Sequence, residues 1–299
     1  MGSANRIMIG LAVGLCAGYA STFSGCATFT RQPTIPGRNK LELDQLVIHS
    51  DFQLSRYHRM LDELTGLRSD VSGKLDLTIF DEPIHIYLFR TDRRYKKFMS
   101  HSFPELPQRR AFFIETDTGL NVYAHWGNHI AEDLRHEVAH GYLHSGVPNL
   151  PLWLDEGLAE YFEVPRGHQG YHASHIELLR DHMRQQTWRP DLNRLERLTM
   201  ASEISLLDYA ESWAWVHFFL ETERSRKEFL QGYLKRLQAE GWSPAISTLL
   251  AEWEESSNER LLDHISSLSP HSVNFSSDRS VEDYLPVVGP TSHGSASAE

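Results

Sequence analysis

Cysteine is nearly absent from this chain of 299 residues: the only two are Cys16 and Cys26, both close to the N-terminus. We expect both to lie within or at the end of a leader segment, so that the folded part has no disulfide and no catalytic thiol. A basic surface is not expected either, because the formal net charge is −11 and no basic stripe appears. The charge excludes nucleic acid as an expected partner.

A long membrane-spanning run is also lacking. The apolar stretch of residues 7–20 follows Arg6, is rich in small residues and is too short to cross a bilayer comfortably. This pattern is typical of an export signal. The stretch Phe23-Ser24-Gly25-Cys26 resembles a bacterial lipobox, with Phe23 where leucine is usual. It implies an exported protein of the bacterial cell envelope, anchored to the membrane by lipid on Cys26. Plain secretion and an uncleaved anchor are the alternatives.

The remaining composition is that of a packed globular protein, with 40% apolar and 11% aromatic residues. We divide the chain into a signal segment (1–26), a tether (27–45), an α/β subdomain with a hairpin (46–126), a helical metal-binding region (127–268) and a disordered tail (269–299). The tether contains prolines and a glycine among polar residues, and the tail has few apolar residues.

The hydrophobic pattern predicts an α+β fold. Strands are expected at residues 46–48 and 84–89, and helices from about residues 55 and 93. Residues 111–114 and 120–124 flank a turn signal at 117–119 and read as a hairpin. We predict a small mixed sheet with a hairpin edge strand, packed on a helix pair and followed by a helical C-terminal lobe. The second hairpin strand is expected at the edge, where it could receive a peptide; a purely structural hairpin is the alternative.

The strongest chemical signal is His136-Glu137-Val138-Ala139-His140, an H-E-x-x-H sequence on a helical pattern. Positions i and i+4 share one helix face, so His136 and His140 can direct two imidazole nitrogens at one ion. Catalytic zinc usually takes three protein ligands and keeps one position for water. Glu137, beside the first ligand, is placed to take a proton from that water.

A third ligand is offered by a second helical pattern. Glu156 lies in Trp153-Leu154-Asp155-Glu156-Gly157-Leu158-Ala159-Glu160, after a break that contains glycine and prolines. A helix, a tight loop and a second helix can return Glu156 to the two histidines. Glu160, one turn later, could accept a hydrogen bond from the far nitrogen of a ligating histidine, or lie on the surface.

Together these stretches resemble the gluzincin zinc metallopeptidases, the thermolysin-like and aminopeptidase-N-like group. Over roughly residues 110–220 the resemblance implies one Zn²⁺ held by His136, His140 and Glu156, with Glu137 as the base. It also implies that Tyr209, at the start of a long helix, donates to the oxyanion; an ordinary half-buried tyrosine, or His217 as the donor, is the alternative. The G-x-M-E-N strand of the aminopeptidase branch is missing, which leaves exopeptidase specificity open.

The expected function is therefore hydrolysis of peptide bonds in peptide or protein substrates. The alternatives are a non-catalytic, metal-containing lipoprotein that binds or scaffolds in the envelope, and hydrolysis of a non-peptide amide or of peptidoglycan crosslinks. Residues 165–175 contain three histidines without regular ligand spacing, and we interpret them as a surface loop.

Overall fold

The computed structural model describes residues 32–56 and 58–269. The predicted export signal, Cys26 and nearly all of the predicted tail lie outside these residues, and the envelope location and lipid anchor stay predictions. Among the described helices, none combines the length and the apolar character that crossing a bilayer requires.

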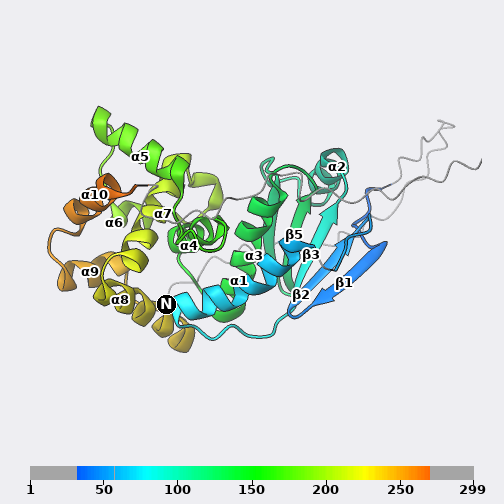
Figure 1. Cartoon of the computed structure of the whole chain (residues 1–299), viewed down its shortest axis with the longest axis horizontal. Coiled ribbons are helices and arrows are strands. Elements are labelled where there is room, and N and C mark those ends of the chain that lie inside the picture. Colours follow the sequence, from blue (N-terminus) through cyan, green and yellow to red (C-terminus); the bar gives the residue numbers. More distant parts are fainter. Residues whose placement is uncertain (1–31, 57, 270–299) are drawn as a thin grey trace, which may run out of the picture.

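One mixed sheet of five strands occupies one end of the described part (Figure 1). The strands are β1 (Asn39–Leu43), β2 (Leu46–Ser50), β3 (Ile84–Phe89), β4 (Ala111–Thr116) and β5 (Gly119–His125), in the order β1-β2-β3-β5-β4. The three central strands run parallel, and β1 and β4 pair antiparallel at the two edges. With the helices described below, this confirms the predicted α+β class and the mixed sheet.

Two predictions about the sheet are wrong. The last part of the predicted tether forms β1, because Leu41 and Leu43 alternate with polar residues and pack against the core. The predicted edge strand at 120–124 is also wrong: β5 hydrogen-bonds with β3 on one side and β4 on the other. The exposed edge of the hairpin is therefore β4.

Helices cover both faces of the sheet. On one face, α3 (Ile130–Gly146) packs on β3, β4 and β5, and α1 (Arg59–Leu75) packs beside α3. The other face holds α2 (Asp92–Ser102) over a separate aromatic cluster that includes Phe89, Tyr95 and Tyr123. The first of the predicted helices begins at Arg59, later than expected, since the His58 side chain accepts from the Met60 amide and caps it.

The C-terminal half is helical, as predicted (Figure 1). Its elements are α4 (Leu152–Glu163), α5 (Ala173–Gln185), α6 (Leu192–Leu195), the short 3₁₀ helix η1 (Ala201–Glu203), α7 (Leu206–Glu221), α8 (Arg224–Glu240), α9 (Ile246–Trp253) and α10 (Ser257–Ser267). Of these, α4 is central, because it packs against α3 on one side and α7 on the other.

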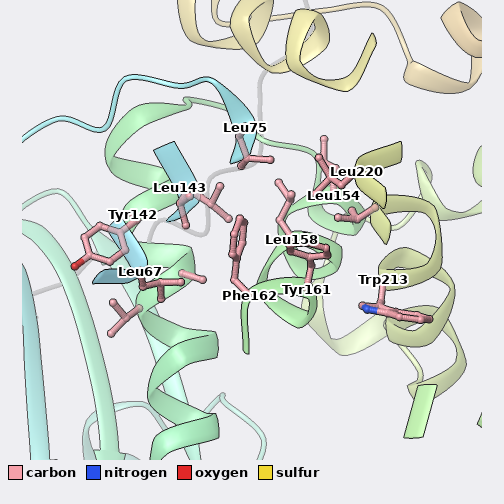
Figure 2. Packing of buried hydrophobic residues seen from close by; sticks show 14 of the residues in the cluster. Leu67, Leu75, Tyr142, Leu143, Leu154, Leu158, Tyr161, Phe162, Trp213 and Leu220 are labelled. Atoms are coloured by element: carbon pink, nitrogen blue, oxygen red, sulfur yellow. The ribbon is translucent and has the colours of Figure 1, made fainter. Parts of the chain in front are cut away.

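Figure 2 shows how α4 joins the two halves. Its residues Leu154, Leu158 and Phe162 lie between side chains of α1 and α3 and those of α7. A glycine permits the closest approach: a Cβ on Gly157 would lie 2.5 Å from the Ser212 carbonyl oxygen on α7. The neighbour of this glycine, Glu156, is thus held at a fixed place relative to α7.

Candidate metal centre

Three side chains from α3 and α4 converge on one point. His136 and His140 lie one turn apart on α3, with their Nε2 atoms 3.3 Å from each other. Glu156, on α4, places its Oε2 atom 3.5 Å from both of these nitrogens. The structure thus brings together the three residues that were predicted as ligands, in a group able to hold a metal ion.

The carboxylate oxygen in this group has no hydrogen-bond partner within the described chain. Glu156 Oε2 is buried, and a separation of 3.5 Å from each imidazole is too long for a good hydrogen bond. A buried, unpaired carboxylate oxygen is costly, so it calls for an explanation. A cation between the three atoms would supply the missing partner.

Carboxylates hold the far nitrogen of each histidine. His136 Nδ1 donates to Glu163 Oε2 at 2.9 Å, and His140 Nδ1 donates to Asp155 Oδ1 at 2.8 Å. Such bonds fix the orientation of ligating imidazoles. The prediction placed Glu160 in this role, and it is wrong: the bond of Glu160 is to His175, at 2.8 Å. Sequence reasoning missed both Glu163 and Asp155.

A chain of polar contacts continues from Asp155 to the edge of the sheet. The other oxygen of Asp155 accepts from His144 Nε2 at 2.9 Å, and His144 Nδ1 contacts Glu115 on β4 at 2.7 Å. His144 is one further turn along the face of α3 that carries His136 and His140. This i+8 spacing was the sequence signal that could have found it.

The charges of the centre are strongly coupled. Burial lowers the pKa of His140, but the charge and hydrogen bond of Asp155, with help from Glu156, outweigh burial and raise this pKa to about 10. Burial likewise opposes charge on His136, yet Glu156 and Glu163 raise its pKa well above the usual value. Burial raises the pKa of Glu156, but the two imidazoles reverse the shift and hold it at about 2. Without metal, these shifts favour the charged form of both imidazoles.

Glu137 follows His136 on the same helix, and its charge interacts with those of His136, His140 and Glu156. Burial raises the pKa of its carboxyl group, and the neighbouring His136 and His140 offset this only in part. The backbone amide of Phe113, on β4, donates to the carboxylate. A carboxylate of raised pKa beside a group of metal ligands can accept a proton near neutral pH.

Tyr209 enters from the first turn of α7, and a residue that the sequence did not single out comes with it. Arg109, in the segment before β4, donates from Nη2 to the Tyr209 hydroxyl at 2.8 Å. Burial raises the pKa of Tyr209 to about 12, Glu156 adds to this shift and Arg109 opposes it. The phenol therefore stays protonated and can donate. The alternative donor, His217, is buried with its ring paired to His264 at 2.9 Å.

The loop of residues 165–175 is not the simple surface loop that the sequence suggested. His175 is buried, and His172 is half-buried and contacts Glu163 at 2.7 Å. The chain turns back after α4, so His172 and His175 lie next to Glu160 and Glu163 at the end of that helix.

Comparison with known proteins adds one finding. Residues 130–239 match the model of a family described as "Protein of unknown function (DUF1570)". The matched stretch begins with α3 and ends within α8, so it includes His136, His140, Glu156 and Tyr209, while the sheet lies outside it. No curated protein matches the chain.

Proposed function

We propose that this protein is a zinc-dependent peptidase of the gluzincin kind, with His136, His140 and Glu156 as the ligands of one Zn²⁺ ion. The proposal rests on the triangle of their donor atoms, with sides of 3.3, 3.5 and 3.5 Å. A tetrahedral zinc ion with bonds of about 2.0–2.1 Å keeps its ligand atoms about 3.3–3.4 Å apart. The residues therefore fit the ion and leave one corner for a water molecule or substrate.

The chain's own groups account for the proton transfers. Zinc, when bound, supplies Lewis acidity and lowers the pKa of water. Glu137 is the base that accepts the proton of the attacking water, and it then delivers this proton to the leaving nitrogen. The partial burial that raises the pKa of Glu137 suits both steps.

The substrate position follows from the free edge of the sheet. The Phe113 amide points away from β5, since it donates to Glu137, and β4 has no strand on its outer side within the described chain. An extended peptide can add to such an edge through backbone hydrogen bonds. On β4 it would lie beside Glu137, which favours peptides over small amides as substrates.

Tyr209 is the oxyanion donor in this arrangement, and Arg109 orients it. We expect Tyr209→Phe to lower kcat by about 10²–10³-fold, the usual effect of removing one such donor, with little change in KM. Steady-state kinetics on a fluorogenic peptide would measure both constants. The matched control is Tyr87→Phe, because Tyr87 stacks on Tyr123 on the α2 face of the sheet. Equal kcat values for Tyr209→Phe and the unaltered protein would remove Tyr209 from the mechanism.

A peptide-library digest tests the function itself. The purified protein should cleave library peptides, lose this activity to a chelator and regain it when zinc is added. A protein that holds zinc at the triangle and cleaves no peptide would instead be the non-catalytic envelope protein. Cleavage confined to peptidoglycan crosslinks or non-peptide amides would keep the metal chemistry and replace the substrate.

A further inference from the structure

A second group of histidines and carboxylates lies behind the first, and we call it the second cluster. It consists of Glu160 and Glu163 at the end of α4, and His172 and His175 at the start of α5. Each pair has i, i+3 spacing, which places its two side chains on one face of the chain. Two imidazoles therefore face two carboxylates across the α4–α5 contact.

Glu160, His172 and His175 each bring one ligand atom within 4.8 Å of the other two, and Glu163 joins this group through its contact with His172. His175 Nε2 is 2.8 Å from Glu160 Oε2, and His172 Nε2 is 2.7 Å from Glu163 Oε1. His172 Nε2 also lies 3.6 Å from Glu160 Oε2, which ties the two pairs together. The imidazole rings stack with centroids 3.8 Å apart, and both Nε2 atoms lie near Glu160 Oε2.

The second cluster is buried and held by the surrounding fold. Glu160 and His175 are 9% and 5% exposed. The Trp213 ring of α7 packs against both imidazoles, and its indole N–H donates to the Gly170 carbonyl at 2.8 Å. Gly170 has a φ of +69°, a backbone conformation that glycine adopts readily, at the turn that brings α5 back onto α4. The positions of the four side chains are thus set by rigid elements.

The donor set is that of a metal site. Burying two carboxylates side by side is unfavourable unless positive charge balances them. Two imidazole nitrogens and two carboxylate oxygens form a four-donor set suited to zinc or another divalent transition ion. We propose that Glu160, Glu163, His172 and His175 bind a second divalent metal ion, with zinc as the first candidate. Glu160, His172 and His175 are the three donors that the structure already brings together, and Glu163, 2.7 Å from His172, is the nearest fourth donor. An ion held by these residues would join α4 to α5.

Glu163 links the second ion to the first centre. Its Oε1 faces His172, while its Oε2 accepts from His136 Nδ1 at 2.9 Å. A metal on the Oε1 side would fix this carboxylate and, through it, the ring of His136. On metal binding, the nitrogen–oxygen contacts of 2.7 and 2.8 Å would widen to about the 3.3 Å between the ligands of a tetrahedral ion.

Metal counting tests this inference. We expect the protein, equilibrated with zinc and desalted, to contain two ions per chain by plasma mass spectrometry. The variants His136→Ala/His140→Ala and His172→Ala/His175→Ala should each keep one ion. The control His182→Ala should keep two, because His182 lies about two turns further along α5 and contacts Thr187 instead. Circular dichroism of each variant reports its folding.

The possible outcomes distinguish the two sites. One ion in the unaltered protein, lost in His136→Ala/His140→Ala, would overturn the second site and leave the proposed function standing. One ion that survives this variant, and that is lost in His172→Ala/His175→Ala, would support the second site and remove the catalytic zinc. If the second double variant does not fold, the count in the unaltered protein and in His136→Ala/His140→Ala still decides.

Discussion

Glu137→Gln should lower kcat for peptide cleavage by up to about 10⁴-fold, the upper end of the effect of a general base. Glutamine keeps the shape of the side chain but cannot accept the proton of the attacking water. The Phe113 amide that donates to the carboxylate can still donate to the amide oxygen, so the local structure should persist. Zinc content and melting temperature should therefore stay close to those of the unaltered protein.

The matched control is Glu132→Gln on the first turn of the same helix. Glu132 contacts Arg110 and is about half exposed, so its replacement should leave kcat within about twofold. Measuring the zinc bound per chain, together with kcat, distinguishes loss of the base from loss of the metal. Cleavage by Glu137→Gln at the rate of the unaltered protein would refute the mechanism.

Zinc binding at the first centre should weaken by about 100-fold for each pH unit between pH 8 and 6. The pKa of His140 is raised to about 10 and that of His136 is raised as well, which favours the charged form of both imidazoles when no metal is bound. Zinc binds only the neutral imidazole and must displace both, and each displaced proton costs about 1.36 kcal/mol per unit as the pH falls. Competition with a chromophoric chelator measures the zinc affinity at each pH. The signal of the first centre is the part that is lost in His136→Ala/His140→Ala.

The variant Asp155→Asn should show a weaker pH dependence of zinc affinity than the unaltered protein. The Asp155 charge raises the pKa of His140, so its loss should lower this pKa and leave His140 neutral over more of the range. The pH dependence should then approach 10-fold per unit, as for a single displaced proton. Zinc affinity that does not change from pH 8 to 6 in the unaltered protein would show that the imidazoles are neutral without metal.

Local periodicity was enough to predict which three side chains converge on one point. The i, i+4 spacing of His136 and His140 depends on one helix, and Glu156 follows after a short break, so few arrangements are possible. The same holds for the strand at residues 84–89, whose bounds agree with β3. These features are determined within about 25 residues of chain.

The contacts of Asp155 and Glu163 with the two histidines depend on how α3 and α4 are oriented relative to each other, which the local sequence does not determine. Helices α3 and α4 cross antiparallel, so the early residue of α4, Asp155, meets His140, and the late residue, Glu163, meets the earlier His136. The sequence predicted that Glu160, one turn after Glu156, would hydrogen-bond to one of these histidines. Its side chain faces α5 instead and bonds to His175.

Contacts between residues far apart in the sequence explain the wrong prediction of the edge strand and the failure to predict Arg109. Whether β4 or β5 forms the edge is decided by the parallel pairing of β5 with β3, over 30 residues earlier in the chain. Arg109 reaches Tyr209 across 100 residues of sequence. Neither contact leaves a periodic trace in the sequence, and both were missed.

The carboxylates that hold His136 and His140 have a consequence for the order in which folding and the proposed metal binding occur. Two protons and one divalent cation carry the same positive charge, so exchanging them leaves the total charge among α3 and α4 unchanged. The polypeptide could thus fold with both imidazoles protonated and bind the proposed metal ion afterwards.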